Sequence, residues 1–142
     1  MTLNVVLSLE PPQPATPVVF LIRSLLEETP TFNDALRKLS ETPIPCDCSL
    51  SLTGTHPGEL AVIERTPSRD AVRRAVDGFV AVTNGYLELE TSSGSSPSSA
   101  LLGTSGARLD RVCALVRQRR PANVDACINY LSNASVRMQI TV

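Results

Sequence analysis

The segments 58–67 and 77–84 constrain the fold of this chain most strongly. In the first, Leu60, Val62 and Glu64 alternate with the side chains between them, which is the period-two pattern of a half-buried strand. In the second, Asp77-Gly78 is a strong turn signal, and the apolar run 79–82 suits a strand buried on both faces. We therefore expect antiparallel strands, the last of which gives way at Asn84.

Asn84 is the first candidate for a functional residue. An asparagine at the end of a strand can direct its side-chain NH2 into a cleft, where it would stabilise a developing oxyanion. Asn84 is also followed by Gly85, and an Asn-Gly pair is common in turns. Local sequence alone favours the turn and leaves both interpretations open.

The remaining patterns predict a layered α/β fold. A first strand at 2–9 is followed by a proline-rich loop, by a helix that Thr16 caps, and by a helix that Thr31 or Asn33 opens. Later helices follow Ser105 and span Asn123–Leu131. The residues expected to face inward are Val18, Val19, Ile22, Leu25 and Leu26 in the first helix, Phe32, Ala35, Leu36 and Leu39 in the second, and Val124, Cys127, Ile128 and Leu131 in the last. This order indicates an antiparallel sheet with helices packed on it. The other predicted strands are 46–53, 59–66, 69–75 (the weakest), 79–83 and 135–142.

An ordered series of short motifs resembles the N-terminal-nucleophile (Ntn) cysteine amidases related to acid ceramidase, N-acylethanolamine acid amidase and isopenicillin N acyltransferase. The resemblance covers about half of the chain and implies a four-layer αββα sandwich, of which this chain would be an incomplete part. The motifs are Pro17-Val-Val-Phe-Leu-Ile-Arg23, Thr31-Phe-Asn-Asp-Ala-Leu-Arg-Lys-Leu39, Thr42-Pro-Ile44, Gly54-Thr-His-Pro-Gly58, Ala61-Val-Ile-Glu64 and Val82-Thr-Asn84.

The resemblance implies roles for two residues. Enzymes of this group cleave amide bonds with an N-terminal cysteine whose own α-amino group is the general base. Asn84 matches the family's oxyanion asparagine, and Arg108 resembles the arginine that neutralises charge in the cleft. Arg111 competes for that second role, and a surface helix arginine paired with a carboxylate is an equally good interpretation of Arg108.

The resemblance also predicts that the nucleophile is missing. In the family, the catalytic cysteine lies before the strand that residues 2–9 resemble. Cys46 and Cys48 fall where relatives have no catalytic residue, and a Cys–His pair of either with His56 is a minor alternative. We therefore expect an amidase or acyltransferase fragment that is inactive alone. The alternative is a non-catalytic remnant or interaction module that uses an exposed sheet edge.

Composition sets the remaining expectations. With 142 residues and a net charge of −1, the chain is expected to be a single partial domain that does not bind nucleic acid. No apolar run is long enough to span a membrane, and a signal peptide is not recognisable, which predicts a cytoplasmic protein if the chain is complete. The segment 91–104 is expected to be a flexible Ser/Gly-rich insert.

Expectations for ligands follow from the same reasoning. The spacing of Cys46 and Cys48 suits no usual metal site, so no metal and no cofactor are predicted. The expected substrate, once the missing segment completes the site, is a small-molecule amide or acyl compound. An open sheet edge would also allow copies of the chain to associate as a homo-oligomer.

Overall fold

The computed structural model describes residues 1–6, 10–89 and 104–132. The chain divides into two compact units, Met1–Ser96 and Pro97–Val142. Most of the predicted insert at 91–104 and the last predicted strand at 135–142 lie outside the described residues.

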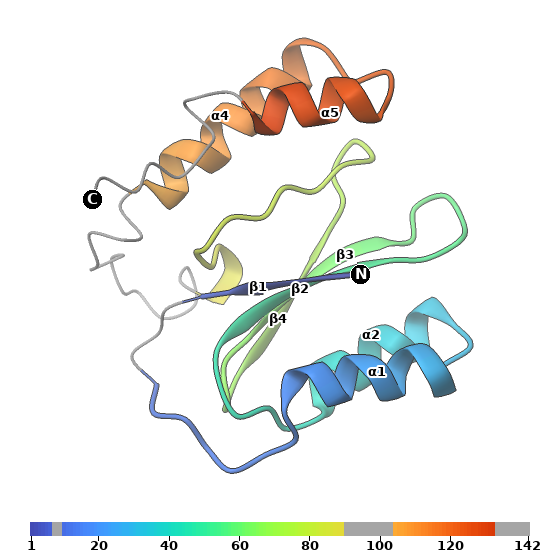
Figure 1. Cartoon of the computed structure of the whole chain (residues 1–142), viewed down its shortest axis with the longest axis vertical. Coiled ribbons are helices and arrows are strands. Elements are labelled where there is room, and N and C mark those ends of the chain that lie inside the picture. The colour runs from blue at the N-terminus through green and yellow to red at the C-terminus, as the bar shows by residue number, and fades with distance from the viewer. Residues whose placement is uncertain (7–9, 90–103, 133–142) are drawn as a thin grey trace. The chain divides into compact units, whose positions relative to one another are not determined.

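The first unit is built on a four-stranded antiparallel sheet in the order β1-β2-β3-β4 (Figure 1). Each strand pairs with the next along the chain, so the sheet is a meander except for the two helices that join β1 to β2. The predicted antiparallel sheet is confirmed, and β4, the weakest of the predicted strands, is formed. The strands are β1 (Thr2–Val5), β2 (Cys48–Thr53), β3 (Leu60–Arg65) and β4 (Asp70–Arg74).

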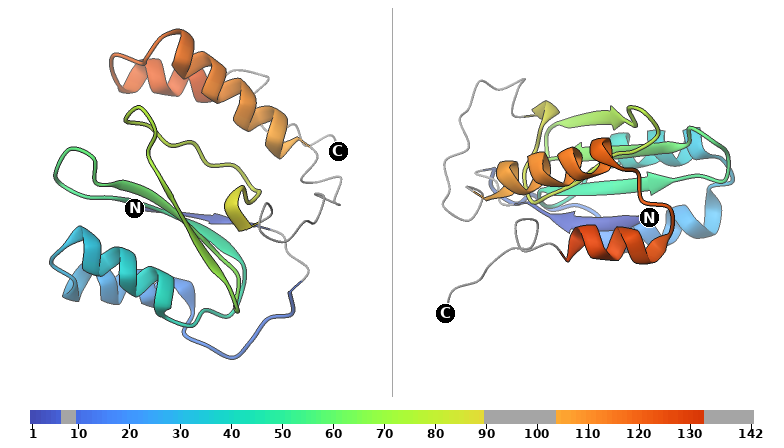
Figure 2. Two further views of the ribbon diagram at one scale, coloured as in Figure 1. Left: turned by 180° about the vertical axis from the view of Figure 1, so that it is seen from behind. Right: turned by 90° about the horizontal axis from the view of Figure 1, so that it is seen from above.

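Two helices, α1 (Val18–Glu28) and α2 (Phe32–Glu41), cover one face of this sheet (Figures 1 and 2). Their apolar residues pack on alternate side chains of β2 and β3 to form the main core. The predicted inward face of α2 is confirmed in full, and Thr31 caps this helix by accepting a hydrogen bond from Asp34 N–H. The core contains Val18, Leu21, Leu25, Phe32, Ala35, Leu36, Leu39, Ile44, Cys48, Leu50, Leu52, Ala61 and Ile63.

The first helix differs from the sequence prediction at its start and on its buried face. Pro17 rather than Thr16 is the N-cap residue, and the Pro17 carbonyl accepts the first hydrogen bonds of the helix. Val19 and Leu26 were expected inside but are exposed, whereas Leu21 is buried. The helix is apolar on most of its surface, so periodicity alone did not determine which stripe faces the sheet.

The Asp77-Gly78 turn is confirmed, but the strand predicted after it is not formed. Asp77 and Gly78 have φ values of 53° and 74°, as a tight hairpin turn requires, and Val76 and Phe79 form an isolated bridge across it. Beyond Phe79 the backbone leaves the ladder and runs irregularly to Tyr86. The prediction of a strand at 79–83 was therefore wrong, because side chains of the sheet bind this backbone in place of a neighbouring strand.

The second unit contains two helices among its described residues, α4 (Ser105–Gln118) and α5 (Val124–Leu131). A helix was predicted after Ser105 without a stated end, and the helix predicted at Asn123–Leu131 agrees with α5 to within one residue. Thr104 rather than Ser105 is the N-cap of α4, and the Asn123 side chain caps α5 by accepting from Ala126 N–H. The residues predicted to face inward from α5, such as Val124 and Ile128, are exposed.

Candidate functional site

Asn84 lies in the irregular segment that follows the Asp77-Gly78 turn, within the first unit. The residues from Ala81 to Gly85 are half-buried and belong to no strand or helix. A loop residue can serve in catalysis only if its backbone is held in place. The contacts that hold this segment come from the sheet face opposite to α1 and α2.

Glu64 is the central residue of that face. It lies on β3 and is fully buried, with an exposed fraction of 0%. Its carboxylate accepts hydrogen bonds from three consecutive backbone N–H groups, those of Leu87 (3.0 and 3.1 Å), Glu88 (2.9 Å) and Leu89 (3.1 Å). A buried carboxylate is tolerated only when it is well paired, and these donors supply much of that pairing.

Arg73 completes the pairing of Glu64. It lies on β4, and its Nε donates to Glu64 Oε1 at 2.7 Å. Its Nη2 donates at 3.2 Å to the carbonyl oxygen of Ala81. The side chains of Arg73 and Glu64 are only 12% and 0% exposed, so water screens this ion pair far less than a surface pair.

Tyr86 anchors the same segment at a second place. Its hydroxyl lies 2.5 Å from the Arg65 carbonyl oxygen and 3.0 Å from Asp47 Oδ2, and its single proton serves either acceptor. Burial, followed by the negative charge of Asp47, raises the pKa of the Tyr86 hydroxyl above its usual value. Tyr86 therefore remains a neutral hydrogen-bond donor, and it is not a base.

Arg65 is the neighbour of Glu64 on β3, but it points to the helix layer. Its guanidinium donates to the carbonyl oxygens of Leu39 and Thr42 at the end of α2, the latter at 2.9 Å. A cation at a helix C-terminus complements the negative end of the helix dipole. The Arg65 side chain therefore joins the sheet to α2, and only the backbone carbonyl of Arg65 helps to hold the Asn84 segment, through Tyr86.

Arg108 belongs to the second unit. It lies in the first turn of α4, where its Nε donates to the Thr104 carbonyl oxygen at 3.3 Å. Arg111 is on the same helix, less than one turn further along. Asn84 and Arg108 therefore lie in different compact units of the chain.

The four cysteines are free thiols, and Cys46 and Cys48 differ in their exposure. Cys48 is buried at the start of β2, whereas Cys46 is exposed and lies before the strand. Burial, with a smaller contribution from Cys46, raises the pKa of the Cys48 thiol to about 12. Such a thiol carries almost no thiolate at neutral pH.

His56 lies in the hairpin loop beyond the other end of β2, as predicted. Its Nδ1 is 3.2 Å from Glu59 Oε2, and the same oxygen accepts the backbone N–H groups of Thr55 and His56. These contacts close the loop between β2 and β3. His56 therefore has a structural role in the hairpin.

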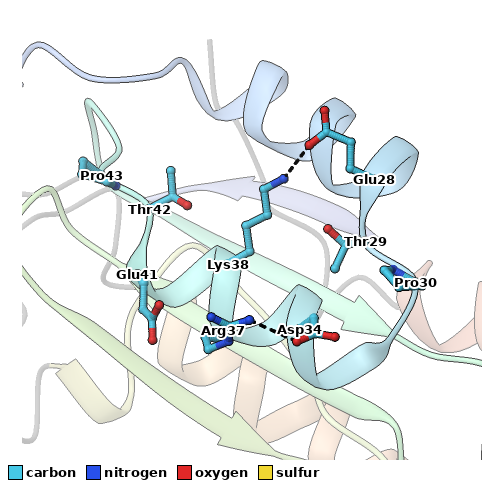
Figure 3. Close-up of a pocket in the computed structure, with 9 residues that line it drawn as sticks. All are labelled: Glu28, Thr29, Pro30, Asp34, Arg37, Lys38, Glu41, Thr42 and Pro43. Atoms are coloured by element: carbon cyan, nitrogen blue, oxygen red, sulfur yellow. Dashed lines mark hydrogen bonds and ion pairs between the residues drawn. The ribbon is translucent and has the colours of Figure 1, made fainter.

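A surface hollow of about 470 Å³ lies at the α1–α2 connection (Figure 3). Four of the five charged side chains that line it form two ion pairs, Lys38 with Glu28 at 3.0 Å and Arg37 with Asp34 at 3.1 Å, and the fifth is Glu41. The hollow belongs to the helix layer, whereas Glu64 and Arg73 lie on the other face of the sheet. It therefore contributes nothing to the surroundings of Asn84.

Residues 1–138 match the family described as acyl-coenzyme A:6-aminopenicillanic acid acyl-transferase. The chain belongs to this family. The match confirms the suspected relationship to the Ntn-type acyltransferases, and the observed sheet with helices on one face agrees with an Ntn-like α/β fold. No curated protein matches the chain.

No helix among the described residues has the length and apolar character needed to cross a membrane. In the same residues, no group of three or more His, Cys, Asp or Glu side chains is arranged to hold a metal ion.

Sequence reasoning missed the roles of Glu64 and Arg73. Glu64 was noticed within Ala61–Glu64, but only as a strand residue and a family motif. The available signal was an acidic residue at an inward position of an otherwise apolar strand, because such a residue must find a partner when it is buried. The partner could not be named without the register of β3 on β4.

Proposed function

We propose that this acyltransferase-family chain supplies the oxyanion side of an Ntn-type site that hydrolyses linear amide C–N bonds or transfers acyl groups. The observation that carries the proposal is the anchoring of the Asn84 segment by a buried ion pair, in a chain that matches the family over residues 1–138. An oxyanion donor must be preorganised, because a mobile amide would have to be ordered during the reaction.

Asn84 would donate a hydrogen bond from its side-chain NH2 to the tetrahedral oxyanion. Removing one such donor typically costs about 2.7–4 kcal/mol of transition-state stabilisation. Arg108 would neutralise negative charge in the cleft, with Arg111 as the competing candidate on the same helix. The substrate would be a small-molecule amide or acyl compound, and the chemistry requires no cofactor.

The nucleophile in this proposal is an N-terminal cysteine carried by a segment beyond these 142 residues, with its own α-amino group as the base. Cys48 is buried with a raised pKa, and Cys46 lies outside the polar sheet face on which Glu64 is found. The 142-residue chain alone should therefore be an inactive part of the enzyme.

The first test is an assay of the purified chain with a panel of N-acyl amides, with product detected by mass spectrometry. We expect no hydrolysis above the rate without protein. Turnover that disappears in Cys46→Ser or Cys48→Ser would contradict the assignment of the nucleophile. Reading the coding DNA upstream of Met1 in frame provides a second check, because a Cys-containing segment there would supply the missing nucleophile.

The second test uses the completed enzyme, by which we mean the chain together with a Cys-bearing segment, encoded in frame or supplied as a second polypeptide. Asn84→Ala should lower kcat about 100- to 1,000-fold. Arg108→Gln and Arg111→Gln, compared in the same assay, would decide between the two arginines, since only one should reduce turnover strongly.

A non-catalytic interaction module remains the second candidate function, and the strand order favours it in one respect. In the order β1-β2-β3-β4, β1 and β4 each have a single strand neighbour among the described residues. An edge strand of this kind can pair with a partner or with a second copy. Under this alternative the completed enzyme would show no turnover, and a proline at Leu3 would abolish self-association measured by analytical ultracentrifugation.

A further inference from the structure

We propose that Glu64 and Arg73 are the positioning residues of the oxyanion donor: as one buried ion pair, they hold both ends of the segment 81–87 and so fix the backbone of Asn84. The catalytic meaning of this inference rests on the proposed function of Asn84. The clamp itself, by which we mean the contacts of Glu64 and Arg73 with this segment, is a separate physical claim.

The contacts are placed symmetrically about Asn84. Arg73 Nη2 holds the carbonyl oxygen of Ala81, three residues before Asn84, at 3.2 Å. Glu64 Oε1 holds the N–H of Leu87, three residues after Asn84, at 3.0 Å. Because Arg73 Nε also donates to Glu64 Oε1 at 2.7 Å, the two ends of the segment are joined through a single ion pair.

The clamp depends on the charge and shape of both side chains. The neighbours of Glu64 across the strands are Ser49 and Ala71, which are too small to take over its contacts. A glutamine at 64 would keep the shape, but it would turn an NH2 group toward either Arg73 Nε or the N–H groups of 87–89, which are all donors. One side of the clamp must then be lost.

The alternative to the clamp is that other contacts of the fold fix the segment 81–87. Tyr86 does provide an independent anchor through Asp47 and Arg65. That anchor lies at the C-terminal end of the segment, whereas Arg73 holds the Ala81 carbonyl oxygen at the other end. Loss of the clamp should therefore raise the mobility of residues 81–85 more than that of Tyr86, which keeps its own hydrogen bonds.

The experiment is a comparison of amide order parameters by NMR on the full chain, wild type against Glu64→Gln. At a temperature where both proteins are folded, the order parameters of Asn84 and Gly85 should be about 0.85 in the wild type and below about 0.6 in the variant. The control is Glu27→Gln, which removes the acid of an exposed ion pair with Arg23 at 2.9 Å and should leave both values unchanged. Unchanged order at Asn84 in folded Glu64→Gln would overturn the proposal.

If Glu64→Gln does not fold, Arg73→Lys tests the clamp in its place. Lysine keeps the charge beside Glu64, but its single ammonium group lacks the planar fork that reaches Glu64 and Ala81 together. We expect residues 81–84 to become mobile while 87–89 stay ordered. Residues 81–84 that remain as rigid as in the wild type would refute the clamp.

The kinetic outcome in the completed enzyme separates this inference from the proposed function. Glu64→Gln should lower kcat roughly 10- to 100-fold through misplacement of the donor, with KM unchanged. A purely structural role would lower the melting temperature without this division between kcat and KM. If Asn84→Ala leaves kcat unaltered, the proposed function fails. The amide order parameters of Asn84 and Gly85 still test whether Glu64 and Arg73 fix this segment.

Discussion

At the scale of single residues, burial decides which groups can take part in chemistry. Glu64 is buried as a charged group because Arg73 and three backbone N–H groups pair with it. Cys48 is buried without such partners, and its pKa rises to about 12. Burial therefore has different consequences for the two residues: Glu64 is held within an ion pair, whereas Cys48 is kept as a neutral thiol.

The cysteines provide a direct test of this difference. During brief treatment with iodoacetamide at pH 8, Cys46 should be alkylated while Cys48 stays unmodified, because Cys48 is buried and its thiolate fraction is on the order of 10⁻⁴ at that pH. Peptide mapping by mass spectrometry would measure both sites. Cys127 is exposed and should be labelled like Cys46, which makes it an internal control. Equal rates at Cys46 and Cys48 would contradict the buried position of Cys48.

The site was only partly predictable from sequence, because one part of it is local and the other depends on strand register. Asn84 could be identified through its motif, since Val82-Thr-Asn84 is local. The Glu64–Arg73 pair could not be identified, because the two residues become diagonal neighbours only in the observed register, in which Glu64 pairs with Ala71 and Val62 with Arg73. A shift of one residue would have placed Arg73 on the helix face.

At the scale of elements, the Asp77-Gly78 turn and the buried face of α2 were the most predictable features. The helix α2 was predicted with its full buried face, because its apolar residues recur at helical spacing and its other residues are polar, and Thr31 was one of its two candidate caps. The strand predicted at 79–83 failed for the opposite reason. An apolar run without alternation carries no information about its partner, and here the Arg73 side chain on β4 binds the Ala81 carbonyl oxygen in place of a neighbouring strand.

Substitution of Thr31 by alanine tests the cap of α2. Thr31→Ala should lower the free energy of unfolding by about 1 kcal/mol, because Asp34 N–H loses its acceptor. Asn33→Ala is the matched control, since Asn33 was the other candidate cap and lies inside the helix; its effect should stay within about 0.5 kcal/mol. Urea unfolding followed by circular dichroism would measure both, and a larger loss for Asn33→Ala would reverse the assignment.

The turn before the Asn84 segment is tested at Gly78. Gly78 has φ of 74°, so Gly78→Ala should destabilise the protein by about 1–2 kcal/mol. Gly106 is a control at which alanine should stabilise the protein. It lies in α4, and an added methyl group would meet no atom within 4 Å. Gly106→Ala should therefore raise helix stability by about 0.5–1 kcal/mol. A neutral Gly78→Ala in urea unfolding would be inconsistent with the observed turn.

At the scale of the whole molecule, the chain combines a family match over residues 1–138 with two compact units. Both hydrophobic clusters among the described residues belong to the first unit, one beneath the helices and one made by Val6, Tyr86 and Leu89. The order of helices and strands in that unit was predictable from local patterns. The division into units was not, because it depends on contacts between distant residues.

Expression of residues 1–96 alone tests this division. Because the first unit contains its own core and sheet, the fragment should fold and unfold cooperatively, with amide shifts of β2 and β3 like those in the full chain. Two-dimensional NMR spectra of the fragment and the full chain would show this. A fragment with collapsed, poorly dispersed amide signals would show that the first unit needs the second to fold.

The central claim is that Asn84, held by Glu64 and Arg73, is the oxyanion donor of an acyl-transfer site. The most direct measurement is kcat of the completed enzyme with Asn84→Ala, compared with the wild type at saturating substrate. The account predicts a loss of about 100- to 1,000-fold with little change in KM. A kcat within about two-fold of the wild type would contradict it.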